Sequence, residues 1–212
     1  MTGPTPHPWP AGVFAELSPP YSVLVADPPW PFAARSVSGW NGPRHLPRHR
    51  HGMPYPTLSL EAISALPVGE LAGADAELYL WTTSRFLRDG FAVVEAWGFP
   101  YRQVLVWAKP PMGYLPGGMF ASTTEFILYA RRGRRGRSLR APTSWWGWPR
   151  VHRHGPVHSA KPPAFLDMVE RVSPGPYLEL FARSPRLGWD AWGWGWRAPA
   201  AETGWEPVAD AG

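Results

Sequence analysis

Cysteine is absent from this chain of 212 residues, and lysine occurs only twice, at Lys109 and Lys161. The lack of cysteine excludes disulfides, cysteine-based zinc sites and thiol catalysis. All the other basic residues are arginine, a skew that is typical of GC-rich coding, as is the abundance of alanine, glycine and proline. A single arginine therefore carries little functional information, whereas the two lysines stand out.

Long apolar runs are also missing. No segment approaches the roughly 18 uninterrupted apolar residues of a membrane helix. Residues 1–10 have neither a basic start nor an apolar core, which argues against a secretory signal. We therefore expect a soluble, cytoplasmic protein that does not use a membrane as partner.

The composition favours one compact domain with long irregular loops. Hydrophobic residues make up 44% of the chain, and 14 tryptophans argue against disorder, whereas 28 prolines and 22 glycines indicate extended loops. The formal net charge of +5 favours a polyanionic partner such as nucleic acid. We expect a flexible proline-rich leader over residues 1–20, a single domain over residues 21–196 and a flexible tail over residues 197–212.

Short apolar strands alternate with amphipathic helices along the chain. The predicted strands are 21–26, 77–82, 102–107, 125–130 and 177–181, and the predicted helices are 58–66, 84–97 (capped by Ser84 and stopped by Gly98) and one that opens at Pro162-Pro163. This alternation predicts an α/β fold, with an open sheet covered by helices on both faces. Ligands of such sheets bind beyond the carboxyl ends of the strands, where Asp27 and Arg183 would lie.

The tetrapeptide Asp27-Pro28-Pro29-Trp30 directly follows the first predicted strand. A carboxylate and a rigidly held Pro28 carbonyl can accept the two hydrogens of an exocyclic amine on a base, which orients its nitrogen toward an electrophilic methyl group. Trp30 offers a face on which an extruded base could stack. The plain alternative is a strand-to-turn junction, since Asp and Pro are common turn residues.

Several blocks resemble, in consistent order, the MT-A seventy (MT-A70) family, whose members methylate N6 of adenine in RNA or DNA with S-adenosylmethionine (SAM). The blocks span about Tyr21 to Trp192 and read YSVLVADPPW, LYLWTT, VVEAWGFPYRQVLVWAKP, TTEFILYARRG, HSAKP and LELFARSPRLGWDAWG. The resemblance implies a Rossmann-like SAM-dependent methyltransferase fold with a mostly parallel sheet. Its motif order is permuted, so the lack of an early GxGxG does not argue against SAM.

The resemblance also implies the roles of individual residues. Asp27, Pro28, Pro29 and Trp30 would be the catalytic motif that holds the target adenine, with Asp27 also near the SAM amino group. Three further residues would contact the cofactor: Lys161 its methionine part, Arg183 its ribose or the rim of the site, and Gly193, which closes the WDAWG block.

One departure from the family pattern follows this block. The family usually continues with Asn and then Glu or Gln, which contact the cofactor ribose, whereas this chain has Trp194 and Gly195. SAM then binds more weakly, or a neighbouring group supplies these contacts, or Trp194 is used differently. The departure keeps open the alternative of a catalytically inactive nucleic-acid-binding paralogue or partner subunit.

Two basic segments are predicted to contact nucleic acid. The first carries arginines followed by indoles that can stack on bases, and the second is a loop with arginine and histidine: Arg131, Arg132, Arg134, Arg135, Trp145 and Trp146, then Arg44 and Arg48. The alternative is a solvated loop that reflects coding bias. DNA is favoured over RNA, because a compact chain without extra RNA-binding domains resembles the bacterial and phage members.

We expect no metal. Pairs and triplets of histidine occur at positions 49, 51, 152, 154 and 158, but no acidic or cysteine partner is convincingly placed, and SAM methyl transfer needs no metal. Glu125 is expected to orient loops near the target base, or to satisfy a buried partner, rather than to act as a general base.

Overall fold

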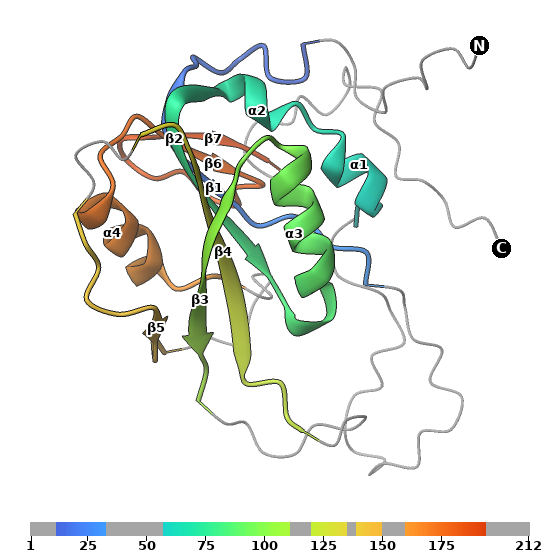
Figure 1. Ribbon diagram of the computed structural model, residues 1–212, viewed down its shortest axis with the longest axis vertical. Coiled ribbons are helices and arrows are strands. Elements are labelled where there is room, and N and C mark those ends of the chain that lie inside the picture. The colour runs from blue at the N-terminus through green and yellow to red at the C-terminus, as the bar shows by residue number, and fades with distance from the viewer. Residues whose placement is uncertain (1–11, 33–56, 111–119, 135–138, 150–159, 194–212) are drawn as a thin grey trace, which may run out of the picture.

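The computed structural model describes residues 12–32, 57–110, 120–134, 139–149 and 160–193 (Figure 1). Their strands form one seven-stranded sheet in the order β5-β3-β4-β2-β1-β6-β7. The strands are β1 Tyr21–Ala26, β2 Ala72–Thr82, β3 Tyr101–Ala108, β4 Thr124–Arg132, β5 Trp145–Trp146, β6 Tyr177–Leu180 and β7 Trp189–Trp192. Of these described strands only β4 runs against the others, so the sheet is mostly parallel, as predicted.

Helices cover both faces of the sheet, which confirms the predicted architecture (Figure 1). One face carries α1 Leu60–Ser64, α2 Val68–Leu71, the 3-10 turn η1 Ser84–Phe86 and α3 Leu87–Ala96, and the other carries α4 Pro163–Val172. Within the described ranges no helix combines the length and apolar character that a membrane crossing requires.

The side chains of β1 alternate between two cores, because successive residues of a strand point to opposite faces. Leu24 and Ala26 pack toward α1, α2 and α3, whereas Val23 and Val25 pack toward α4. From Val23 to Ala26 the strand is therefore continuously apolar, as expected of an interior strand that is covered on both sides. Its rigid carboxyl end supports the residues that follow.

Helix α4 begins as the sequence predicts. Pro163 occupies the first helical position, where its missing N–H and fixed φ are favourable. Phe165, Met168 and Val169 are all buried in the second core, at the i, i+3 and i+4 spacing of one helix face. Lys161 lies two residues before this helix, so the packing of α4 fixes its backbone.

The predicted helix over residues 84–97 differs in its start. Ser84 lies inside the 3-10 turn, and neither that turn nor α3 has a side-chain cap, so the predicted Ser84 cap is wrong. Buried Phe86 links the two elements instead, so packing rather than capping starts the helix. Gly98 follows α3 with a φ of 78°, the left-handed conformation in which glycine ends helices, as predicted.

Strands β5 and β7 were not predicted from the sequence. Each is very short and rich in tryptophan, and each pairs with a strand that was predicted, β3 and β6 respectively. Neither segment shows the clear alternation that identifies a half-buried strand. Pairing with the existing sheet edge therefore decides their conformation.

Part of the predicted leader packs against the domain. The ring of Phe14 meets Trp192 edge-on at 5.0 Å, and the indole nitrogen of Trp192 donates to the Val13 carbonyl at 3.1 Å. Val13 and Phe14, within the segment predicted as a leader, thus contact the end of β7. Residues 1–11 and 194–212 lie outside the described residues, and the domain limits stay a prediction.

Candidate active site

Charged side chains from five segments meet at one end of the sheet. Asp27 follows β1, Lys109 follows β3, and Arg183 comes shortly after β6, because the carboxyl ends of parallel strands share one edge. Glu125 stands near the start of β4, which reaches the same edge because this strand runs in the opposite direction. Lys161 approaches from the segment before α4.

These five residues form an alternating sequence of charges, which we call the charged row. Arg183 lies 3.6 Å from Oδ2 of Asp27, and the same oxygen lies 2.9 Å from Nζ of Lys161. Nζ of Lys161 is also 3.2 Å from Oε2 of Glu125, and Oε1 of Glu125 is 2.7 Å from Nζ of Lys109. Each carboxylate therefore contacts two cations, and Lys161 is shared by both carboxylates.

The charged row keeps its central groups ionised. Burial by itself raises the pKa of the Glu125 carboxyl, but the charges of Lys161 and Lys109 outweigh it and hold that pKa below its ordinary value. Burial likewise lowers the pKa of the Lys161 ammonium, and Asp27 and Glu125 together raise it above its ordinary value. Glu125 and Lys161 are thus charged at neutral pH.

Both lysines lie over buried indoles. Nζ of Lys161 is 5.2 Å from the ring of Trp81, and Nζ of Lys109 is 5.3 Å from the ring of Trp107. The two indoles meet edge to face at 5.9 Å, so they form a continuous aromatic floor under the charged row. A cation over an aromatic face is stabilised by the ring quadrupole, most strongly where water is excluded.

The DPPW turn is fixed by backbone hydrogen bonds. The Trp30 N–H donates to the Pro28 carbonyl at 2.9 Å, and the Leu58 N–H donates to the Pro29 carbonyl at 2.9 Å. A carbonyl oxygen has two lone pairs, so Pro28 keeps one acceptor site beyond its bond with Trp30. The turn thus holds a carboxylate and a partly free carbonyl in fixed relative positions.

The side chain of Trp30 is buried, whereas the predicted stacking of a base requires an accessible ring. Its side chain is 3% exposed, its indole nitrogen donates to the Trp81 carbonyl at 3.1 Å, and its ring stacks on Phe86 at 5.6 Å. The ring is thus covered in this structure, and the stacking of a base on it stays a prediction. Trp30 instead anchors the DPPW turn in the core.

The chain turns sharply between β6 and Arg183. Phe181 has a φ of 63°, a conformation that side chains other than glycine rarely adopt. Gly193 closes on this turn: a Cβ atom there would lie 2.4 Å from the Ala182 nitrogen, so no side chain fits. The structure therefore gives Gly193 a close-packing role next to the segment that carries Arg183, and its cofactor contact stays a prediction.

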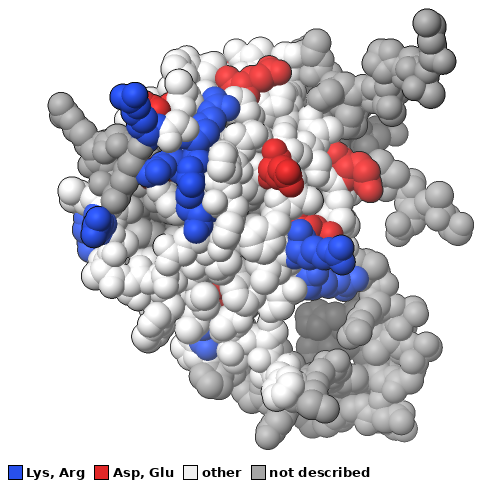
Figure 2. Space-filling view, viewed as in Figure 1, with Lys and Arg blue, Asp and Glu red and all other residues white. Residues whose placement is uncertain are grey.

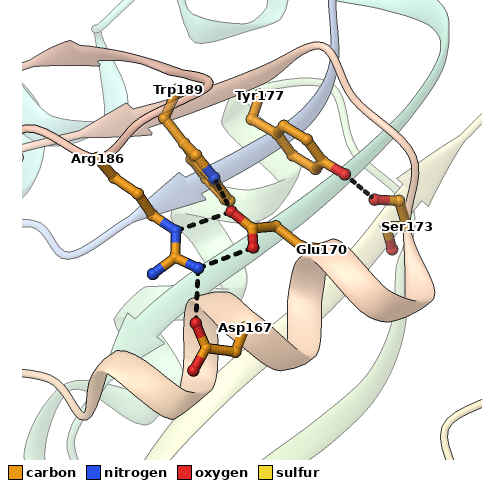
Figure 3. A network of polar contacts seen from close by, with 6 residues as sticks. All are labelled: Asp167, Glu170, Ser173, Tyr177, Arg186 and Trp189. Atoms are coloured by element: carbon orange, nitrogen blue, oxygen red, sulfur yellow. Dashed lines mark hydrogen bonds and ion pairs between the residues drawn. The ribbon is translucent and has the colours of Figure 1, made fainter.

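A polar network fastens α4 to the segment between β6 and β7 (Figure 3). Arg186 binds Glu170 through two nitrogens, at 2.7 and 2.8 Å, and reaches Asp167 at 2.6 Å. The indole nitrogen of Trp189 donates to Glu170 at 2.6 Å, while the Tyr177 hydroxyl donates to the Ser173 carbonyl at 2.8 Å. The segment that carries Arg183 and the helix that follows Lys161 are thereby held together.

The predicted nucleic-acid residues do not gather in one place. Arg131, Arg132 and Arg134 lie at the opposite end of the sheet from Asp27, where β4 ends beside the start of β2. Figure 2 shows basic side chains gathered at the upper left of this view, over that end; they are arginines, because both lysines lie in the charged row. Arg132 donates there to the carbonyls of Ala72 and Gly73, which gives its guanidinium a structural role.

Trp145 and Trp146 lie at the same end of the sheet as the charged row, since they pair with Val106 and Trp107 of β3. Trp145 is 61% exposed, whereas the ring of Trp146 stacks on Trp148 at 5.0 Å. Other predicted residues lie outside the described residues: Arg44, Arg48, Arg135, Trp194 and Gly195. Their predicted contacts therefore stay predictions.

The described residues contain no group of three or more histidine, aspartate or glutamate side chains that could hold a metal ion. The histidines considered in the sequence, at positions 49, 51, 152, 154 and 158, lie outside the described residues. The charged row itself alternates cations with carboxylates, and cations close to each carboxylate disfavour a metal there.

Sequence reasoning missed two polar groups at this edge. It singled out Lys109 as rare but gave it no role, although Lys109 binds Glu125 directly. It did not consider Thr83, at the end of β2, whose buried hydroxyl has no hydrogen-bond partner among the described residues. The scarcity of lysine was the signal for the first, whereas nothing in the sequence distinguishes Thr83.

The chain is similar to known proteins over the residues that form this fold and this site. A family model described as MT-A70 matches residues 21–195. The type II methyltransferase M.MunI of Mycoplasma sp is 32% identical over 188 residues, which are 82% of this chain and 76% of that protein. The N6-methyladenosine RNA methyltransferase MTA1 of Cryphonectria parasitica is 29% identical over 195 residues, 85% of this chain and 53% of that protein.

A human protein is also similar over the same region. The N(6)-adenosine-methyltransferase catalytic subunit METTL3 of Homo sapiens is 26% identical over 179 residues, which are 77% of this chain but only 26% of that protein. The likeness therefore concerns one region of the larger eukaryotic proteins and most of the bacterial one. With the family model matching nearly the whole described fold, from β1 through Gly193, the chain belongs to the MT-A70 family.

Proposed function

We propose that this chain transfers a methyl group from S-adenosylmethionine to N6 of adenine in DNA. The observation that carries the proposal is the position of Asp27, which directly follows β1 and lies 2.9 Å from Lys161 at the carboxyl edge of the sheet. Membership of the MT-A70 family supports the reaction class, as does the likeness to proteins named as adenosine N6-methyltransferases.

The charged row has groups that suit the methionine part of the cofactor. Lys161 and Arg183 are cations that can pair with its carboxylate, and Asp27 is a carboxylate that can pair with its ammonium group. The unpartnered hydroxyl of Thr83 offers a further polar contact at the end of β2. These residues therefore fit a zwitterionic amino-acid moiety.

The DPPW turn suits the amine that is to be methylated. An exocyclic amine on adenine is a poor nucleophile, because its lone pair is delocalised into the ring. Asp27 and the free lone pair of the Pro28 carbonyl can each accept one of its hydrogens, which orients the nitrogen. The cofactor supplies an electrophilic methyl group on a sulfonium centre, and the proton lost from N6 passes to Asp27 or to water.

The choice of DNA rests on the bacterial relative. The match covers 76% of the type II methyltransferase of Mycoplasma sp, whereas it covers 53% of the fungal RNA methyltransferase. The exposed indole of Trp145, at the same sheet end as Asp27, offers a stacking surface for a nucleotide. We assign the arginines at the far end of β4 no part in this contact.

The proposal is tested with purified protein, tritiated SAM and adenine-containing DNA or RNA of equal length, with modified positions read by sequencing. Asp27→Asn is expected to lower methyl transfer at least a hundredfold, because a neutral amide can neither pair with the cofactor ammonium nor stabilise the positive charge that develops on the attacking nitrogen. Asp75→Asn is the matched control: Asp75 is exposed at the opposite end of the sheet.

Circular dichroism and thermal unfolding check that both variants are folded. Methylation by Asp27→Asn near the wild-type level would contradict the role of Asp27. Absence of SAM binding by the wild-type chain at millimolar concentration would favour the inactive nucleic-acid-binding paralogue instead. Methylation of RNA without methylation of DNA would overturn the choice of substrate but leave the reaction intact.

A further inference from the structure

Lys109 has no place in the reaction proposed above, although it is one of only two lysines in the chain. Both lysines contact the same residue, Glu125, through different oxygens: Lys109 through Oε1 at 2.7 Å and Lys161 through Oε2 at 3.2 Å. A chain that uses arginine almost everywhere else thus has compact ammonium groups on both sides of one carboxylate. This coincidence calls for a physical reason.

Lys109 is held firmly in place. Its backbone N–H donates to the Thr123 carbonyl at 2.6 Å, which ties the end of β3 to the segment leading into β4. Its side chain is 12% exposed and its Nζ lies 5.3 Å from the Trp107 ring. An arginine fork at this place would need room for a planar group, whereas an ammonium needs only one point of contact.

The charges explain why Glu125 needs a second cation. Without Lys109, the two carboxylates of Asp27 and Glu125 would share Lys161, and the buried Glu125 would have no other cation among the described residues. The ammonium of Lys161 would then be drawn toward Glu125, because Asp27 would still have Arg183 as a second cation. With Lys109 present, both carboxylates contact two cations, and Lys161 stays between them.

We propose that Lys109 is a positioning residue, which holds one oxygen of Glu125 so that the other oxygen fixes the Lys161 ammonium beside Asp27. The inference rests on the proposed function, since a fixed Lys161 matters for pairing with the cofactor carboxylate. Lys109 touches neither cofactor nor base in this scheme. It acts through Glu125.

A pH signature distinguishes this role from mere structural support. The charged groups facing Glu125 are Lys109 from β3 and Lys161 before α4; Asp27 and Arg183 lie beyond Lys161. The adjacent end of β2 contributes Thr82 and Thr83, which carry no charge. Without the charge of Lys109, less electrostatic attraction opposes the effect of burial on Glu125, and the pKa of Glu125 rises. Glu125 then becomes neutral, and loses its ion pair with Lys161, at a higher pH.

The scarcity of lysine makes this directly measurable. Protein labelled with ¹³C at lysine Cε gives two lysine side-chain signals, and a variant lacking Lys109 retains only that of Lys161. In the wild-type chain the Lys161 signal is expected to stay constant down to acid pH. In Lys109→Met the Lys161 signal is expected to shift as Glu125 becomes protonated, with a midpoint about one pH unit or more above that in the wild-type chain. This corresponds to a tenfold or greater change in the proton affinity of Glu125.

The same variant is measured in SAM titrations by calorimetry and in methylation assays across pH. We expect the variant to bind SAM several-fold more weakly than the wild-type chain near pH 5, with a smaller loss at pH 7, where Glu125 is again ionised. Lys109→Arg keeps the charge and is expected to restore most of the pH behaviour. Arg102→Met removes one positive charge from the other, exposed end of the same strand, and is the matched control.

A Lys109→Met protein whose Lys161 signal and SAM affinity follow the wild-type pH dependence would overturn the proposal, even with reduced thermal stability. A pH dependence changed equally by Arg102→Met would also overturn it. The NMR titration needs neither SAM nor substrate. A wild-type chain that fails to bind SAM or to methylate would therefore refute the proposed function, while the coupling of Lys109 to Lys161 is still tested by NMR.

Discussion

The ammonium of Lys161 lies 2.9 Å from Oδ2 of Asp27, although the two residues are far apart in the chain. Asp27 directly follows β1, an interior strand of the sheet, and Lys161 lies just before α4, which covers one face. Their contact joins the DPPW motif to the HSAKP motif in one site. Both groups are largely shielded from water, each with a side-chain exposure of 19%, so their charges interact strongly.

Replacement of Lys161 tests the cofactor contact. Lys161→Met is expected to weaken SAM binding roughly ten- to a hundredfold, because an apolar side chain cannot pair with the cofactor carboxylate. Isothermal titration calorimetry measures this directly. Arg171→Met, which removes a cation from the exposed last turn of α4, is expected to bind SAM as the wild-type chain does. Equal affinity of the two variants would exclude a cofactor role for Lys161.

Replacement of Trp30 tests its role as an anchor. Trp30→Phe keeps a ring against Phe86 but loses the hydrogen bond to the Trp81 carbonyl. We expect a loss of roughly 1–3 kcal/mol in the free energy of unfolding, measured with urea. Affinity of the folded variant for DNA is expected to stay unchanged. Wild-type stability combined with much weaker DNA binding would instead restore the base-stacking role.

Replacement of Trp145 tests the proposed nucleic-acid contact. Stacking of a base on an exposed indole contributes roughly 1–3 kcal/mol, so Trp145→Ala is expected to weaken single-stranded DNA binding by a corresponding factor. Fluorescence anisotropy of a labelled oligonucleotide gives the dissociation constant. Phe91→Ala removes a partly exposed ring on α3 and serves as the control. A Trp145→Ala protein with unchanged affinity would place the DNA elsewhere.

Glu179 lowers the stability of the folded chain as pH rises, whereas the contribution of Glu125 to stability is lost as pH falls. Burial, and then the nearby charge of Asp27, raise the pKa of Glu179 from 4.5 to about 7. Between these values the folded chain binds more protons than the unfolded chain, so the contribution of Glu179 to stability falls as pH rises through this range. Above about pH 7 Glu179 is ionised in both states, and the folded chain carries the full free-energy cost of burying its charge.

Glu179→Gln is therefore expected to stabilise the protein by roughly 1–3 kcal/mol at pH 8 relative to wild type. At pH 4.5 the two proteins are expected to differ little, because Glu179 is then protonated in the folded chain and about half protonated in the unfolded chain. Urea unfolding at the two pH values measures the difference. A stabilisation of equal size at both pH values would mean that the charge of Glu179 is not its cause.

Cation contacts set the pH range over which the charged row is stable. The pKa of Glu125 is held below 4.5, so its contribution is present above 4.5 and is lost as pH falls through the folded value. The pKa of Lys161 is held above 10.5, so its contribution is present below 10.5 and is lost as pH rises through the folded value. Between these limits Glu125 and Lys161 both stay ionised.

The main elements followed from local patterns in the sequence. The apolar run of β1, the proline start of α4 and the glycine stop at Gly98 each reflect conformational preferences of the residues themselves. The missed strands β5 and β7 have no such local pattern. They become strands because a neighbouring strand offers unpaired backbone groups, which is a property of the folded sheet.

By itself, the sequence determined the alternation of strands and helices, the family blocks and the identity of Asp27 and Lys161 as site candidates, because these depend on residue types and their order. Only the tertiary structure decided what surrounds each side chain. In the folded chain Trp30 is buried in the core, Arg131 and Arg132 lie at the far end of the sheet, and Lys109 contacts Glu125. Burial and charge contacts depend on which strands become neighbours, and the strand order is a property of the whole chain.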